Sequence, residues 1–256
     1  MPHLVICRDA ADLAVRAADL VIERAAEAVQ ERERFTLVLS GGSTPAKTYD
    51  HLAQPAQLSR MDWSKAYLFL GDERFVPPDD ERSNFAMVWR TLLARVPVPA
   101  AQVFPIPTQG RSAAECAAAY ADMLTRFAAD SHATSPPQFD LILLGLGDDG
   151  HTASLFPGAE ALGVRDAWVT WSRPGTLSPH VDRITLTYAV LNAARHVVFL
   201  VSGERKAETL RKVLEGPASP EQCPAAGVRP TAGTVTWLVD EAAGHLLTRR
   251  ELEQPS

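Results

Sequence analysis

Apolar and polar positions follow two periods along this chain. Short apolar runs are typical of strands that are buried on both faces, and longer segments with apolar residues three and four positions apart are typical of amphipathic helices. The short runs predict strands at 4–7, 35–39, 66–70, 103–106, 139–144, 196–201 and 234–239. The helical spacing predicts helices at 9–32, 83–94, 113–129 and 204–214, and another from Pro45 to about Ala53. The segments 168–171 and 183–186 are weaker strand candidates.

The segment 9–32 is the longest predicted helix. It is rich in alanine, and its apolar residues lie near helical spacing at Leu13, Ala17, Leu20, Val21 and Ala28. Strands and helices then alternate along the sequence, which predicts an α/β fold with a doubly wound, mostly parallel sheet and helices on both faces. Pro-rich stretches at 96–107, 135–137 and 217–230 are interpreted as loops, so we expect a single domain over residues 1–256.

The composition limits the kinds of molecule that the protein is expected to bind. The chain has 256 residues, 46% of them apolar, which is enough for a sizeable core. Its formal net charge of −6 disfavours a nucleic-acid surface. An anionic substrate would therefore need a local basic pocket.

The cysteines indicate a reducing compartment. Cys7, Cys116 and Cys223 are far apart, odd in number and free of C-x-x-C spacing, so neither a disulfide framework nor a zinc site is expected. We also find no basic-then-apolar leader and no run near the ~20 apolar residues of a membrane span. These features predict a cytoplasmic protein that contacts neither membrane nor nucleic acid.

The most informative segment is 145–157, with the sequence GLGDDGHTASLFP. It follows the buried run 139–144, and the carboxyl ends of strands in open α/β sheets are where ligands bind. Its glycines permit a sharp turn, and His151 is suited to proton transfer near neutral pH. The segment lacks the third glycine of a dinucleotide fingerprint, so we interpret it as a sugar or phosphate loop. A tight loop with a solvated histidine is the alternative.

A second polar loop, 40–45 with the sequence SGGSTP, follows the strand 35–39 and opens a helix. Its two glycines expose backbone N–H groups, two hydroxyls can donate, and a positive helix end follows, so the loop would form a binding site for an anion such as phosphate. A simple Ser or Thr helix cap is the alternative.

Basic residues follow two further strands. After 66–70 comes Gly-Asp-Glu-Arg, in which Arg74 suits bidentate recognition of phosphate and Asp72 would orient a hydroxyl or a water molecule. After 196–201 comes Ser-Gly-Glu-Arg-Lys, in which Lys206 would add a point charge, and Arg183 is a weaker candidate of the same kind. For each of these residues taken alone, a surface ion pair or a solvated side chain is the alternative. Their recurrence at successive strand ends favours a phosphosugar site.

These motifs resemble those of the 6-phosphogluconolactonases, in the superfamily that also contains the glucosamine-6-phosphate deaminases. The resemblance rests on 40–45, on GDERFVP at 71–77 with Ser-Asn at 83–84, and on 145–157. It extends through RITL at 183–186, SGERK at 202–206 and WLVD at 237–240, and so covers nearly the whole chain.

The resemblance implies hydrolysis of 6-phospho-D-glucono-1,5-lactone to 6-phosphogluconate, in the pentose phosphate pathway, without metal or organic cofactor. His151 would take a proton from water and return it to the ring oxygen, and Asp149 would orient His151. Asp72 would lie near the sugar ring. The phosphate would be held by Gly42, Ser43, Thr44, Arg74 and Lys206.

Two other functions compete with this one. In the deaminases of the superfamily, the segment at this turn resembles Gly-His-Ile-Ala-Phe-Asn-Glu-Pro. The glutamate of that pattern is absent from 151–157. A non-catalytic sugar-phosphate sensor would need a DNA-binding extension, for which the sequence before the strand at 4–7 offers no room. The pair of Asp149 and His151 also favours catalysis.

Overall fold

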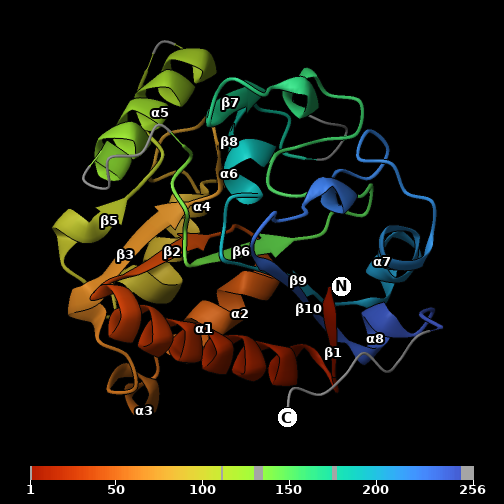
Figure 1. Ribbon diagram of the computed structural model, residues 1–256, viewed down its shortest axis with the longest axis horizontal. Helices are drawn as coiled ribbons and strands as arrows, with labels where there is room; N and C mark the ends of the chain where they lie inside the picture. The colour runs from red at the N-terminus through yellow and green to blue at the C-terminus, as the bar shows by residue number, and fades with distance from the viewer. Residues whose placement is uncertain (1, 111, 130–134, 175–177, 249–256) are drawn as a thin grey trace.

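The computed structural model describes residues 2–110, 112–129, 135–174 and 178–248 (Figure 1). The ends of the domain expected over 1–256 lie outside these residues. Within them, a seven-stranded parallel sheet has the strand order β1-β10-β9-β6-β2-β3-β5. Its strands are β1 (His3–Cys7), β2 (Phe35–Leu39), β3 (Ala66–Leu70), β5 (Val103–Phe104), β6 (Leu141–Gly145), β9 (His196–Val201) and β10 (Thr234–Asp240).

The central strands have few polar residues because both of their faces are buried. β2 is buried along its whole length, and β6 is buried from Leu141 to Leu144. On β9 and β10, Phe199 and Trp237 stack with ring centroids 3.9 Å apart. Fully buried runs of this kind are characteristic of parallel sheets covered on both sides.

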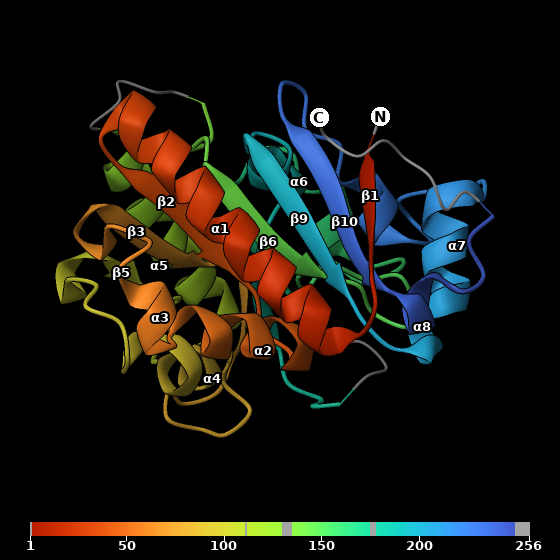
Figure 2. The same cartoon turned by 90° about the horizontal axis from the view of Figure 1, so that it is seen from below.

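Helices cover both faces of the sheet (Figures 1 and 2). Helix α1 (Ala10–Arg32) runs across one face with α2 (Ser43–Leu52) beside it, and α5 (Ala113–Ala129) lies on the other side (Figures 1 and 2). The Asp9 carboxylate caps α1 by accepting from the N–H groups of Ala11 and Asp12. The remaining helices are α3 (Pro55–Leu58), α4 (Asn84–Val88), α6 (Tyr188–Leu191), α7 (Ala207–Glu215) and α8 (Glu241–Gly244). The predicted fold class is therefore confirmed.

A second, antiparallel sheet was not foreseen. Strands β4 (Asp72–Arg74), β8 (Arg183–Leu186) and β7 (Val169–Ser172) form it in the order β4-β8-β7. We did not predict a strand after 66–70, but the chain leaves β3 at Gly71 and pairs at once with β8. The weak strand candidates are strands, but they belong to this small sheet.

Two predicted helices differ in detail from the observed ones. The segment 83–94 begins as α4, capped by the Ser83 hydroxyl, and continues as a π-helical turn over Trp89–Leu93. The segment 204–214 begins with a 3₁₀ turn, Glu204–Lys206, before α7. Such changes of helix type have no clear signal in hydrophobic spacing, since the apolar face is similar. No helix among the described residues is long and apolar enough to cross a membrane.

Candidate active site

The loops at the carboxyl ends of β2, β6 and β9 and one face of the small sheet line a single pocket of ≈ 280 Å³. All of the predicted site residues except Asp149 line it: Gly42, Ser43, Thr44, Asp72, Arg74, His151, Arg183 and Lys206. Asp149 lies just behind, in contact with His151. Parallel strands gather these loops because their carboxyl ends point to the same edge.

His151 and Asp149 form a hydrogen-bonded pair. The Nδ1 atom of His151 is 2.6 Å from Oδ1 of Asp149, and the backbone N–H of His151 donates to the same oxygen at 3.0 Å. An ionised carboxylate only accepts, so Nδ1 carries the proton and Nε2 is the basic nitrogen. The ring of Phe156 lies 4.9 Å from the His151 ring and helps to fix its orientation.

The environment of Asp149 favours its ionised form. Partial burial opposes ionisation, but the hydrogen bond and charge of His151 and the backbone N–H groups outweigh it, so that the pKa of Asp149 lies below its usual value. A carboxylate that stays ionised at neutral pH stabilises the imidazolium that forms when His151 accepts a proton.

Gly147 makes this pair possible. A Cβ atom at position 147 would lie 2.0 Å from Nδ1 of His151 and 2.6 Å from Oδ1 of Asp149. The backbone N–H of Gly147 also donates to the carbonyl of His151 at 2.8 Å, which closes the turn. The glycine is therefore needed for the close approach of the backbone to the His–Asp pair.

The start of α2 forms the second wall of the pocket. Gly42 precedes the helix with a φ of 109°, a conformation that favours glycine, and no side chain caps the helix. Ser43 and Thr44 both line the pocket at this positive helix end. Uncapped N–H groups beside a pocket suit an anion, so the structure fits the phosphate interpretation of this loop better than the helix-cap alternative.

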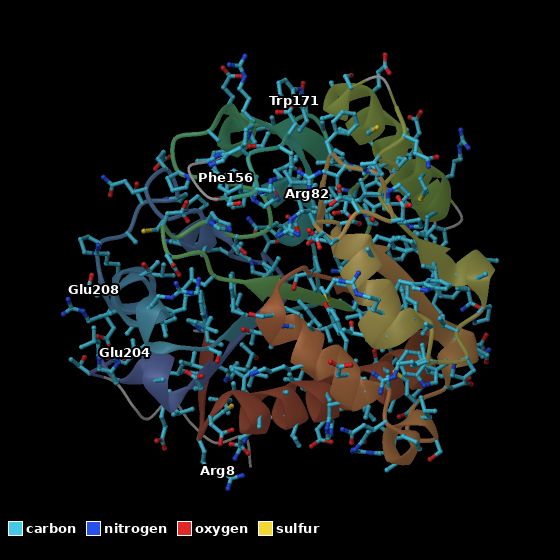
Figure 3. All side chains as sticks on the ribbon, turned by 180° about the vertical axis from the view of Figure 1, so that it is seen from behind. Arg8, Arg82, Phe156, Trp171, Glu204 and Glu208 are labelled. Carbon is cyan, nitrogen blue, oxygen red and sulfur yellow. The ribbon has the colours of Figure 1, made fainter. Side chains whose placement is uncertain are left out.

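Lys206 enters the pocket from the turn after β9. The neighbouring acidic side chains of Glu204 and Glu208 project to solvent on this side of the molecule (Figure 3). The Lys206 ammonium forms an ion pair with the carboxylate of Asp148 in the histidine loop. The hydroxyl of Thr209 donates to the backbone carbonyl of Asp148 at 2.6 Å, which holds this partner in place. The pairing of Lys206 with Asp148 was not predicted.

Arg74 and Arg183 face each other across the small sheet. They are directly opposite residues of the β4–β8 ladder. The Nη1 of Arg74 donates to the carbonyl of Arg82 and the Nη2 of Arg183 donates to the carbonyl of Pro179, while both Nε atoms are buried without a partner in the described part of the chain. Burial and the charge of Arg74 lower the pKa of Arg183. Both arginines line the pocket, and like charges at directly opposite positions repel each other.

Asp72 shares the face of β4 that bears Arg74, since alternate residues of a strand point to the same side. Its carboxylate accepts from the hydroxyl of Ser154 at 2.6 Å, and its backbone carbonyl accepts from the Asn84 amide at 2.9 Å. Sequence reasoning missed both partners, although Ser154 belongs to the 145–157 motif and Asn84 to the Ser-Asn pair. A hydroxyl or amide gives no signal of its partner until the fold is known.

The same site holds no evident metal-ligand cluster. Among the residues that the structure describes, no group of three or more His, Cys, Asp or Glu side chains lies close enough to hold a metal ion. The carboxylates of the histidine loop are instead engaged with His151 and Lys206.

Comparison with known proteins gives consistent matches over most of the chain. Residues 8–237 match the family model described as glucosamine-6-phosphate isomerases/6-phosphogluconolactonase. The chain is 39% identical over 237 residues to the 6-phosphogluconolactonase of Nostoc sp., covering 92% of this chain and 94% of that protein. It is 40% identical to the human 6-phosphogluconolactonase over 245 residues, covering 93% and 90% of the two chains.

Solved structures agree with this match. The 6-phosphogluconolactonase from Trypanosoma cruzi superposes with a TM-score of 0.84 at 29% identity, covering 97% of this chain and 98% of that chain. A monomeric glucosamine-6-phosphate deaminase also superposes, with a TM-score of 0.80 at 21% identity over 96% of this chain and 100% of that one. The second likeness concerns the fold alone, so the two activities must be separated by the residues of the site.

Proposed function

The chain belongs to the family of glucosamine-6-phosphate isomerases and 6-phosphogluconolactonases, and on that premise we propose that it hydrolyses 6-phospho-D-glucono-1,5-lactone to 6-phosphogluconate. This is the second step of the oxidative pentose phosphate pathway. The observation that carries the proposal is the oriented pair of His151 and Asp149 facing a pocket lined by cationic groups. A phosphorylated, neutral lactone ring matches a site with one base and several anion-binding groups.

In this mechanism Nε2 of His151 accepts a proton from a water molecule as the water oxygen attacks the lactone carbonyl carbon. The tetrahedral intermediate then collapses, the bond between the carbonyl carbon and the ring oxygen breaks, and the imidazolium returns its proton to that oxygen. The carboxylate of Asp149 keeps Nδ1 protonated throughout and stabilises the transient positive charge. A δ-lactone is an activated ester, so a positioned water and base are sufficient without a nucleophilic serine.

In this proposal the phosphate group is held by other residues that line the same pocket. The N–H groups at the start of α2 bind its oxygens, and Lys206, Arg74 and Arg183 supply positive charge. Support comes from the two facing guanidinium groups, whose repulsion an anionic ligand would relieve. Binding at the phosphate also places the distant carbonyl against the water on His151, so part of the phosphate binding energy serves the reaction.

One residue of the site, Phe156, argues against the rival deaminase activity. In the resembling deaminase pattern the glutamate follows the histidine by five residues, and Phe156 occupies that position here. Its ring packs 4.9 Å from the ring of His151. A hydrocarbon ring cannot exchange the proton that ring opening of an amino sugar requires.

The direct test is to supply 6-phosphogluconolactone at slightly acidic pH, where its spontaneous hydrolysis is slow, and to follow acid release. Glucosamine 6-phosphate, with ammonia as the product, is the control substrate. The proposal expects rapid acid release from the lactone and no ammonia. Release of ammonia from glucosamine 6-phosphate without faster lactone hydrolysis would show that the protein is a deaminase and would refute the proposal.

We also propose that the enzyme works in the cytoplasm, with a phosphorylated sugar lactone as its partner and no nucleic acid or membrane. Support comes from the cysteines, since Cys7, Cys116 and Cys223 are buried and free. Burial raises the pKa of Cys7 to about 11, which keeps that thiol protonated and unreactive.

A further inference from the structure

Ser154 of the histidine loop contacts the small sheet, where its hydroxyl donates to the Asp72 carboxylate at 2.6 Å. We propose that Ser154 is a positioning residue whose hydroxyl holds the Asp72 carboxylate in the orientation that binds the hydroxyl groups of the sugar ring. The inference rests on the proposed lactone hydrolysis and adds a residue to it. It is carried by geometry on three elements that the fold brings together.

The first step concerns how Ser154 is held. Its backbone N–H donates to the Thr185 hydroxyl at 3.2 Å, and Thr185 is the residue directly opposite Asp72 in the β4–β8 ladder. Between His151 and Ser154 the chain turns at Ala153, whose φ of 47° is uncommon for a residue with a side chain. Strained backbone of this kind is concentrated at functional sites, where the surrounding structure maintains it. Here it lets His151 and Ser154 line the same pocket.

The second step concerns the two oxygens of Asp72. The Ser154 hydroxyl donates to Oδ2 at 2.6 Å, and both residues are almost fully buried, with 1% and 7% of their surface exposed. Among the residues that the structure describes, Oδ1 accepts only from the Asn84 amide at 3.4 Å, a long contact. The carboxylate lines the pocket and therefore retains capacity to accept on that oxygen. Hydroxyl groups of a sugar ring are donors of the matching kind.

The third step concerns what the hydroxyl of Ser154 changes. A charge-assisted O–H···O⁻ bond restrains the carboxylate plane, and the Asn84 amide holds the backbone of the same residue by donating to its carbonyl. Without the hydroxyl, rotation about the Cβ–Cγ bond of Asp72 is less restricted. The substrate ring then loses a fixed acceptor, and the carbonyl is less often aligned with the water on His151.

The inference makes a prediction that separates Ser154 from the phosphate-binding residues. Sugar hydroxyl groups are present in both the phosphorylated lactone and plain gluconolactone. The variant Ser154→Ala should therefore lower kcat/KM by about tenfold on both substrates alike, the usual effect of losing one hydrogen bond to a charged group. A loss restricted to the phosphorylated lactone would overturn the proposal, because Ser154 would then act at the phosphate.

A double-mutant cycle tests whether Ser154 acts through Asp72. We expect Ser154→Ala to lower kcat/KM about tenfold in the wild type and less than about twofold in an Asp72→Ala background, because there is no carboxylate left to hold. If Asp72→Ala fails to fold by circular dichroism, Asp72→Leu provides the second background, because leucine is similar in size to aspartate and has no atom that accepts a hydrogen bond. Equal losses from Ser154→Ala in both backgrounds would show a general effect on the loop and would overturn the proposal.

Thr152→Val is the matched control. Thr152 lies on the same loop and is equally buried, but its hydroxyl donates at 2.9 Å to the backbone carbonyl of Gly145, away from Asp72. Thr152→Val should change kcat/KM by the same factor in the wild type and in the Asp72 variant. If Thr152 couples to Asp72 as strongly as Ser154 does, Ser154 has no specific role in positioning Asp72. A wild-type protein without lactonase activity would refute the proposed function itself, which distinguishes that failure from failure of the inference.

Discussion

Arg74 and Arg183 lie directly opposite each other in the β4–β8 ladder, and neither forms an ion pair with a carboxylate in the described part of the chain. Like charges at directly opposite positions destabilise an antiparallel pair. In a protein with a net charge of −6 this arrangement places positive charge in the pocket, where we propose that the phosphate binds. Together with Lys206 and the start of α2, it explains how an acidic protein would bind a phosphorylated substrate.

The first prediction concerns the cationic residues. Arg74→Ala and Lys206→Ala should each lower kcat/KM for the phosphorylated lactone by about tenfold or more, since a charge-assisted contact is worth roughly 1.5–3 kcal/mol. Plain gluconolactone, which lacks the phosphate, should be affected much less. Steady-state kinetics with both lactones measure the difference, and equal losses on the two substrates would place the phosphate elsewhere.

The second prediction concerns Gly147. Gly147→Ala should abolish most activity, because the new Cβ would overlap Nδ1 of His151 and must displace the ring or the loop. Gly163→Ala is the matched control, since a Cβ at position 163 meets nothing within 4 Å. Kinetics and melting temperatures of both variants check this. Full activity in Gly147→Ala would show that the close approach of loop and ring is dispensable.

The third prediction concerns pH. The pKa of Asp149 is lower in the folded protein than the usual value of 3.8, so its ionised form stabilises the fold above that pH. This stabilisation is fully present at neutral pH and is lost as the pH falls through 3.8 toward the lowered folded value. The variant Asp149→Asn should therefore lose less stability than the wild type between pH 5 and the lowest pH at which both fold, roughly the range over which such a carboxylate titrates. Urea unfolding at several pH values measures this, and parallel losses in the two proteins would contradict it.

The fourth prediction concerns metal ions. Treatment with EDTA should leave lactone hydrolysis unchanged, because the proposed mechanism uses a histidine and a water molecule without a Lewis acid. The control is the same enzyme with added zinc or magnesium, which should give no stimulation. Loss of activity in EDTA with recovery on adding zinc would require a metal-based mechanism.

The parallel sheet and most of its strands could be predicted, since buried runs such as 196–201 have a clear apolar pattern and are bounded by polar turns. The small sheet could not, because β4 is a three-residue strand of charged side chains, Asp72–Arg74. Its stability comes from pairing with β8, a contact distant in sequence. Local propensity carries no information on such pairing.

The candidate site could be predicted where one short motif contains several glycines and polar side chains. The loops at 40–45 and 145–157 could be identified because glycines and polar residues directly follow apolar runs. The contacts between loops were not predictable, and these include the bond from Ser154 to Asp72 and the ion pair of Lys206 with Asp148. Each joins residues more than fifty positions apart, so only the folded chain reveals it.

The central claim is that His151 is the general base, and the variant His151→Asn tests it most directly. Asparagine is close in size and polarity to the histidine, so the protein should fold with an unchanged circular dichroism spectrum. Its kcat on 6-phosphogluconolactone should fall by about 10²–10⁴-fold, the usual contribution of a general base, while binding of 6-phosphogluconate stays near that of the wild type. A variant that folds normally and retains near wild-type kcat would contradict the mechanism.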